Sequence, residues 1–101
     1  MKNGIGNLSI PVDNYMKLIQ ADNRGFIISF ILKRKEYLLI YTKANNYRAG
    51  HSHDKTQFNV IIEGDIMWNN KIIKDFLIRT MPNEYHKMYS ITDSLIIEWK
   101  E

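Results

Sequence analysis

The stretch "FIISFILKRKEYLLIYTK", residues 26–43, joins two runs of β-branched and aromatic residues through three basic residues. Such runs favour strands, and Lys33 to Lys35 is short enough to turn a hairpin between them. Similar short runs follow at residues 57–62, 66–68, 71–73, 75–80, 86–91 and 94–100. Roughly eight short strands with closely spaced turns predict an all-β fold, either a sandwich or a small barrel.

The connections between these runs carry ordinary turn residues. Asn69 and Asn70 predict a tight turn, because Asn tolerates a positive φ. Residues 43–50, "KANNYRAG", are predicted to form a loop. Only residues 13–21 could hold a helix, and a short one, so we expect less than about a fifth of the chain to be helical.

The composition is that of one ordinary globular domain of 101 residues, with 45% apolar and 25% charged residues. We expect an N-terminal arm over residues 1–24 and the domain itself over residues 25–101. The formal charge is +3 and the basic residues are scattered, which argues against nucleic acid as a partner. With no cysteine, no signal-peptide pattern and no apolar run long enough to cross a membrane, a soluble cytoplasmic protein is expected.

The stretch "HSHDKTQFNVIIEG", residues 51–64, holds two of the three histidines of the chain. In a strand, His51 and His53 would point to the same face. If that segment pairs as a hairpin with the strand that starts at Gln57, the Gln57 amide lies opposite the two imidazoles. His86 would close the site if its strand borders the first. Three imidazoles and an amide oxygen suit a borderline divalent ion such as Fe, Mn, Ni, Co or Zn.

The same stretch resembles the first signature of the cupin superfamily, which is His-x-His, three or four residues, an acid, six residues and Gly. His51, His53 and Gly64 match this signature in register, and Gln57 stands where the acid usually is. The resemblance implies that His51, His53 and Gln57 are the first group of metal ligands.

A second stretch, "MPNEYHKMYS" at residues 81–90, resembles the second cupin signature, Pro-x-Gly-x-x-His. His86 falls on its metal-binding His, and Asn83 replaces its Gly. Asn45 likewise replaces the Gly that precedes the first signature. Both replacements are mild, since Asn is the next-best residue after Gly for left-handed backbone.

What the resemblance implies is a cupin-type jelly-roll β-barrel, or double-stranded β-helix, over residues 25–101. Cupins hold their metal inside the barrel and are often dimers. The implied site is one divalent ion (Zn, Ni, Mn or Fe) bound by His51, His53, Gln57 and His86. Because free imidazole must be neutral to bind a metal, we expect affinity to fall as the pH drops through about 6.5.

The amide at Gln57 leaves the ion with its full charge, which favours Lewis-acid work over redox chemistry. A signature with Gln at this place is similar to that of small cupins that linearise unsaturated uronate sugars, in which an acid on the last strand contributes. Glu98 holds a similar place here and is the predicted catalytic acid or base. If Ile97 and Trp99 fill the core instead, Glu98 faces water.

The sequence therefore predicts a metal-dependent isomerase, tautomerase or lyase acting on a small polar, sugar-like or carboxylated molecule. A metal-dependent dioxygenase and a non-catalytic small-molecule-binding protein are the alternatives. Asn59 shares the inward face of Gln57, and Tyr41, Arg48 and Met88 are the other predicted pocket residues.

We also expect a homodimer, because a small jelly roll leaves sheet edges and faces to be covered. The apolar run "NLSIPV", residues 7–12, is the predicted arm that reaches across to the second copy.

Overall fold

The computed structural model describes residues 16–101, with the side chains of residues 49–51 excepted. This part of the chain forms ten strands. Their bounds are β1 Met16–Asp22, β2 Gly25–Leu32, β3 Lys35–Thr42, β4 Asn46–His51, β5 Gln57–Glu63, β6 Ile66–Trp68, β7 Lys71–Ile72, β8 Leu77–Thr80, β9 His86–Ser90 and β10 Ser94–Lys100. Residues 16–101 contain no helix, and therefore none that could cross a membrane.

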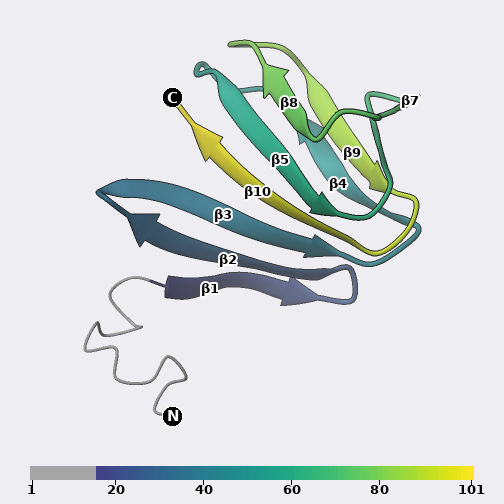
Figure 1. Ribbon diagram of the computed structural model, residues 1–101, viewed down its shortest axis with the longest axis horizontal. Coiled ribbons are helices and arrows are strands. Elements are labelled where there is room, and N and C mark those ends of the chain that lie inside the picture. The colour runs from purple at the N-terminus through teal and green to yellow at the C-terminus, as the bar shows by residue number, and fades with distance from the viewer. Residues whose placement is uncertain (1–15) are drawn as a thin grey trace.

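The strands form two antiparallel sheets. One has six strands in the order β1-β2-β3-β10-β5-β8, and the other has four in the order β4-β9-β6-β7. In Figure 1, β4 passes behind β5 and β8, and buried residues of both sheets pack together, so the two sheets face each other. The all-β jelly-roll prediction is confirmed.

The core lies between the sheets because each strand turns alternate side chains inward. Ile78 and Ile96 from the six-stranded sheet pack with Ile66 and Met88 from the four-stranded sheet, and all four are buried. Along β5 and β10 the same inward face continues with polar residues. This change from apolar to polar along one face sets the position of the candidate site.

Several turns are built by residues in the left-handed region of φ. Asn69 and Asn70, with φ of 51° and 68°, make the predicted tight turn between β6 and β7. Asn45 and Asn83 have φ of 67° and 64°, so both asparagines adopt the backbone for which Gly is ordinarily preferred. The interpretation of these two positions as mild replacements of Gly is confirmed for the backbone.

Three local predictions were wrong. Residues 16–101 form ten strands rather than roughly eight, since β1 occupies Met16–Asp22, which overlaps the one segment that could hold a helix, and β4 occupies part of the predicted loop 43–50. The segment that ends at His51 does not pair with the strand that starts at Gln57, because β4 and β5 belong to different sheets. β4 pairs instead with β9, which carries His86. The predicted arm at residues 7–12 lies outside the described residues.

Candidate functional site

The two histidine segments meet because β4 and β9 are neighbours. The backbone of His51 lies opposite His86 in the β4–β9 register. His53 lies just beyond the end of β4, and its carbonyl oxygen accepts a hydrogen bond from the backbone N–H of Asn83. This bond ties the segment after β4 to the turn before β9. As a result the rings of His53 and His86 lie side by side, with centroids 5.3 Å apart.

His86 is held by contacts on two sides. Its ring stacks on Trp68 with centroids 5.5 Å apart and planes within 2°. Its Nδ1 lies 3.3 Å from the carbonyl oxygen of Glu84, which can only accept, so Nδ1 is the donor of this bond. The Nε2 atoms of His86 and His53 are both buried. Metal-binding histidines commonly donate one ring N–H to a backbone carbonyl in this way and coordinate through the other nitrogen.

Gln57 is buried next to these histidine segments at the start of β5, with 1% of its surface exposed. Its Nε2 donates to Oδ1 of Asn59 at 2.8 Å. That bond orients the amide and leaves Oε1 buried with no hydrogen-bond partner among the described residues. The Oγ1 atom of Thr80, directly opposite Gln57 in the β5–β8 register, is in the same condition. Buried polar atoms are ordinarily paired, so two unpaired acceptors side by side mark a place for a ligand or ion.

A chain of hydrogen bonds leads from Gln57 to Glu98. Nδ2 of Asn59 donates to Oε1 of Glu98 at 3.1 Å, and Nζ of Lys100 lies 3.4 Å from the other carboxylate oxygen. The Glu98 side chain is only 13% exposed. Trp99, its neighbour, stacks on Phe58 on the opposite face of the sheet. The structure therefore turns Glu98 inward, which the sequence left open.

A cavity of about 40 Å³, here called the inner cavity, joins Glu98 to His86. This volume is close to the share of one water molecule in the liquid, so the cavity admits one small group such as an oxygen atom. Its lining comes from both sheets and consists of Ile40, Arg48, Asn59, Trp68, His86, Met88, Ile96 and Glu98. Among them are three of the four predicted pocket residues, Arg48, Asn59 and Met88.

Tyr41, the fourth predicted pocket residue, lies elsewhere. Its neighbours Ile40 and Thr42 turn inward and are buried, so Tyr41 takes the outer face of β3 and stacks on Phe26. Its hydroxyl donates to Asp93 at 3.2 Å. Desolvation raises the pKa of Tyr41, and the charge of Asp93 adds to the rise. Tyr41 therefore does not belong to the site around Glu98.

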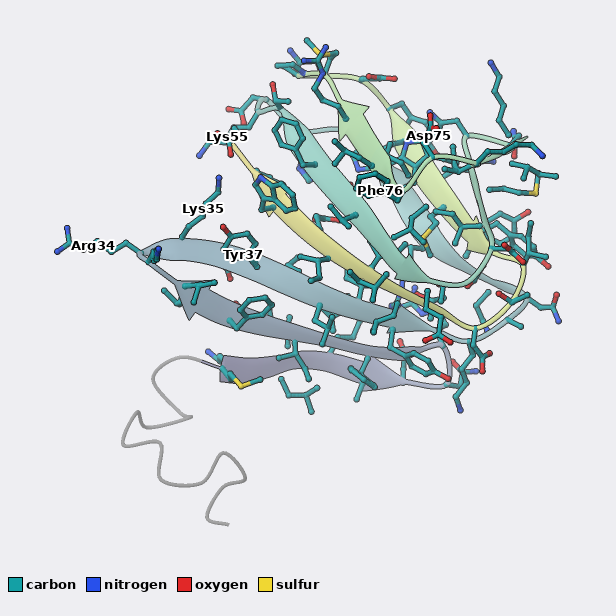
Figure 2. The ribbon with its side chains drawn as sticks, viewed as in Figure 1. Arg34, Lys35, Tyr37, Lys55, Asp75 and Phe76 are labelled. Carbon is teal, nitrogen blue, oxygen red and sulfur yellow. The ribbon has the colours of Figure 1, made fainter. Side chains whose placement is uncertain are left out.

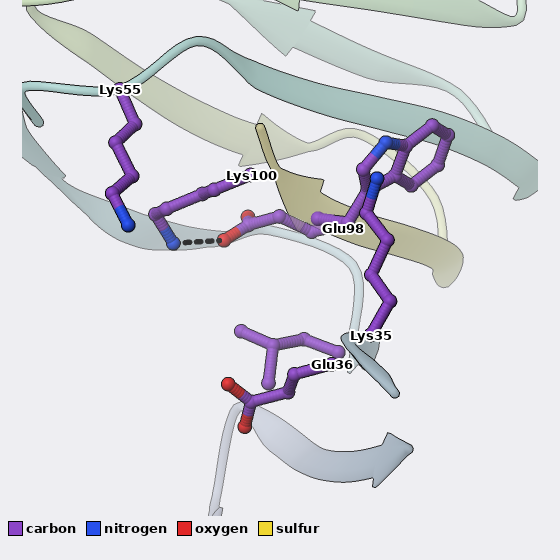
Figure 3. Close-up of a pocket in the computed structure, with 7 residues that line it drawn as sticks. Lys35, Glu36, Lys55, Glu98 and Lys100 are labelled. Atoms are coloured by element: carbon purple, nitrogen blue, oxygen red, sulfur yellow. Dashed lines mark hydrogen bonds and ion pairs between the residues drawn. The ribbon is translucent and has the colours of Figure 1, made fainter. Parts of the chain in front are cut away.

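Two wider recesses reach Glu98 from outside. One, the outer recess, has a volume of about 280 Å³ and is lined by Gln20, Arg24, Ile27, Leu38, Ile40, Arg48 and Glu98. The other, the lysine recess, has a volume of about 240 Å³ and is lined by Lys35, Glu36, Leu38, Lys55, Glu98, Trp99 and Lys100. Figure 3 shows the ion pair between Lys100 and Glu98 in the lysine recess, with Lys55 nearby.

Comparison with solved structures places this arrangement among known folds. An RmlC-like cupin from Shewanella frigidimarina matches with a TM-score of 0.69 and 12% identity, over 93% of this chain and 90% of that chain. The chain has the cupin fold. AerE from Microcystis aeruginosa matches with a TM-score of 0.73 and 14% identity over 86% of this chain. CapF from Staphylococcus aureus, described as a capsular polysaccharide assembling protein, matches with a TM-score of 0.67 and 20% identity over 93% of this chain.

These likenesses establish the cupin fold and nothing finer. The chain spans 46% of the length of AerE and 30% of that of CapF, so both are larger proteins that contain a similar fold. No family model and no curated protein matches the sequence.

Within the cupin fold, the predicted metal ligands divide into two groups. The rings of His53 and His86 lie side by side, and Gln57 is buried at the start of β5. Among the described side chains, no three His, Cys, Asp or Glu residues gather as a metal-binding group. The side chain of His51 is outside that set, so its part as a ligand stays a prediction.

Sequence reasoning missed two contributors to the site. Thr80 follows the inward Ile78 by two residues, so strand alternation would have placed it inward. Lys100 follows Glu98 by two residues and shares its face for the same reason. Lys55, by contrast, lies in a loop, and no periodic signal in the sequence connects it with the recess.

Proposed function

We propose that this protein binds one divalent metal ion and catalyses an isomerase, tautomerase or lyase step on a small polar, sugar-like or carboxylated molecule. The observation that carries the proposal is the buried, unpaired amide oxygen of Gln57. It belongs to a polar cluster that continues through Asn59 to an inward-facing carboxylate, Glu98.

The donors that surround this point fit a borderline divalent ion. Imidazole nitrogens from His51, His53 and His86 would supply neutral ligands, and the Gln57 oxygen a neutral fourth. The bond between Nδ1 of His86 and the Glu84 carbonyl supports this role, since metal-binding imidazoles ordinarily donate their other ring N–H to such an acceptor. Zn, Ni, Mn and Fe all suit such a set. When bound, the ion would act as a Lewis acid that polarises a carbonyl or hydroxyl oxygen.

Glu98 is placed to move a proton. It lines the inner cavity together with His86, so a ligand oxygen in that cavity would contact both the His86 ring and the Glu98 carboxylate. Asn59 and Lys100 hold the two carboxylate oxygens and fix their direction. A positioned carboxylate of this kind contributes about 10²–10⁴-fold to proton transfer. Asn59 acts as a positioning residue, because it bonds both Gln57 and Glu98.

A sugar-like ligand is in keeping with the description of one protein that shares the fold. One neighbour, CapF, is described as a capsular polysaccharide assembling protein. In the lysine recess, Lys35 and Lys100 pair with Glu101 and Glu98, and Lys55, for which no ion pair is found among the described residues, favours an anionic molecule over a neutral one.

Turnover of unsaturated and keto sugar acids, followed by NMR after loading the protein with each metal, tests the proposal. We expect Glu98→Gln to lower kcat about 10²–10⁴-fold while metal content and melting temperature stay unchanged. Glu36→Gln, in the same lysine recess but hydrogen-bonded to Ser29, is the matched control and should keep full activity.

Two outcomes would contradict this assignment. Oxygen consumption by the iron-loaded protein, coupled to loss of the substrate, would indicate a dioxygenase. Ligand binding without turnover under every metal would indicate a non-catalytic binding protein.

A further inference from the structure

Arg48 is a partly buried cation that bridges the two sheets. It extends from β4, in the four-stranded sheet, to residues of the six-stranded sheet. Its Nε donates to Oγ1 of Thr42 at 3.0 Å, and its terminal nitrogens donate to the carbonyl of Tyr41 at 2.8 Å and to Oε1 of Gln20 at 3.3 Å. All three acceptors are neutral.

Arg48 forms no ion pair among the residues whose side chains are described. Arg24, on the same outer recess, differs because it pairs with Asp22 at 2.8 Å. Burial lowers the pKa of Arg48 and the neighbouring Arg24 lowers it further, while the charge of Asp22 acts in the opposite direction. A partly buried cation without a direct ion pair is favoured by a bound anion, which would supply that pair.

Two N–H groups of Arg48 are not used in its hydrogen bonds to the protein. A guanidinium carries five N–H groups, and the three bonds to protein acceptors leave two, one on each terminal nitrogen. Arginine commonly binds carboxylates through two parallel N–H groups, which gives both strength and direction. Lysines of the neighbouring recess can attract an anion but lack this planar geometry.

The position of Arg48 links the surface to the site. It lines both the outer recess and the inner cavity, and Glu98 does the same. The two side chains are not bonded to each other, so a ligand can lie between them. The outer recess, at about 280 Å³, has room for a molecule of six or so carbon atoms, whereas the inner cavity admits only one small group.

We propose that Arg48 binds the carboxylate of a small hydroxy or keto acid in the outer recess and so directs the rest of the molecule toward Glu98. The chemistry at Glu98 rests on the proposed function, but binding of the carboxylate by Arg48 does not, because it needs no metal. The substrate class is thereby narrowed from small polar molecules to small carboxylic acids.

Calorimetric titration of the full chain with glucuronate and with its uncharged amide, glucuronamide, tests the inference. These probes differ only in the group that Arg48 would recognise. We expect glucuronate to bind at least about 10-fold more tightly, both with a chelator present and after metal loading, since hydrogen bonds to charged groups are the stronger kind. In Arg48→Met the two affinities should become equal.

Arg79→Met is the matched control, because Arg79 is exposed on β8 and its loss changes the net charge equally. It should keep the preference for glucuronate. Arg48→Lys, which keeps the charge without the planar fork, should keep only part of it. If Arg48→Met fails to fold, the NMR signal of the Arg48 Nε–H group in the unaltered protein must still shift with glucuronate and not with glucuronamide.

Equal binding of the two probes, or a preference that survives in a folded Arg48→Met, would overturn the inference. Glucose 6-phosphate bound as tightly as glucuronate would overturn the assignment to carboxylates. If the unaltered protein binds metal and turns over a substrate but does not prefer glucuronate, only the role of Arg48 is overturned. If the unaltered protein prefers glucuronate but binds no metal, only the proposed function is overturned.

Discussion

At the scale of single residues, Gln57 is the most informative position in the interior. Its amide nitrogen is committed to Asn59, so its oxygen cannot turn away to find another donor. A buried acceptor left without a partner costs about 1–3 kcal/mol of stability. Thr80 carries a second such atom directly across the sheet. A buried polar atom that has no hydrogen-bond partner in the protein is ordinarily a sign that a ligand, ion or water supplies one.

Gln57→Glu replaces the amide with a carboxylate of nearly the same volume. We expect it to tighten divalent binding and to reduce isomerase or lyase activity, because an anionic ligand makes the ion polarise its substrate less. Without metal, the variant should be less stable by about 1–3 kcal/mol, since the donor to Asn59 is lost and a charge is buried. Metal titration, turnover and urea unfolding measure the three effects.

Gln57→Ala is the companion variant and separates ligation from packing. It should weaken metal binding by less than the loss of one histidine, since the imidazoles remain. Unchanged metal affinity in Gln57→Glu would place Gln57 away from the ion and contradict this account of its missing charge.

At the scale of elements, the β2–β3 hairpin is closed by residues that do not favour its turn. Lys33 and Arg34 have φ of 51° and 67°, both in the left-handed region. In the β6–β7 hairpin the residues with positive φ are Asn69 and Asn70, which tolerate the left-handed region better. The β2–β3 turn therefore stores backbone strain that a change of sequence can release.

Lys33→Asn combined with Arg34→Gly should raise the free energy of unfolding by about 1 kcal/mol, because Asn-Gly is favoured in two-residue hairpin turns. Urea unfolding checks this. Asn70→Ala is the converse test and should lower stability by a similar amount, because Asn70 has a positive φ and, unlike Asn69, no side-chain hydrogen bond to the segment that leads into β9. No change in either variant would contradict the assignment of strain to these turns.

The strands themselves could be predicted because their signals are local. The runs at 66–68 and 94–100 match β6 and β10 residue for residue. β4 was missed because residues 43–50 are rich in turn formers, and only pairing with β9 makes part of them a strand. The hairpin expected between His51 and Gln57 failed for a related reason. Which sheet a strand joins depends on partners distant in sequence, and no local pattern carries that information.

The faces of the sheet on which Glu98 and Tyr41 lie could not be predicted from local sequence patterns either. Both faces of β10 carry large apolar residues, Ile96 inward and Trp99 outward, so alternation alone could not tell which face was the interior. The second sheet decides this by covering the face of Ile96 and Glu98. Tyr41 falls on the uncovered face of β3. The segments that carry His53 and His86 lie side by side as the cupin resemblance implied, because the resemblance supplied a long-range proximity that local patterns lack.

At the scale of the whole molecule, the interior divides into an apolar part and a polar part. The cluster of Ile66, Ile78, Met88 and Ile96 holds the two sheets together. Polar residues replace it toward the end of β10, where the lysine recess opens. Lys35 and Lys55 extend at this same end of the molecule, and Asp75 and Phe76 lie away from it (Figure 2). The fold thus provides a stable core and a polar pocket side by side.

The outer face of the six-stranded sheet predicts a homodimer. It carries stacked aromatic pairs, including Phe30 with Tyr37 and Phe58 with Trp99, and no described residue forms a layer over it. At the edge strand β1, Leu18 is 59% exposed on this same face, opposite Ile28. A second copy related by two-fold symmetry is the commonest way to cover such a surface. Light scattering at micromolar concentration should give twice the chain mass.

Leu18→Lys should shift the protein toward monomers, because it places a charge within the interface. Ile72→Lys, at an exposed isoleucine on β7 of the four-stranded sheet, is the control and should leave the dimer intact. A monomeric parent protein, or a Leu18→Lys variant that remains fully dimeric, would contradict the interface.

Elemental analysis of the protein after incubation with divalent ions and desalting tests the proposed metal centre most directly. We expect about one ion of Zn, Ni, Mn or Fe per chain, and almost none when His51, His53 and His86 are all changed to Ala. Asp54→Ala, an exposed carboxylate in the same segment, is the control and should keep the full content. Full metal content in the triple histidine variant, or none in the parent protein with any of the four ions, would contradict the metal centre.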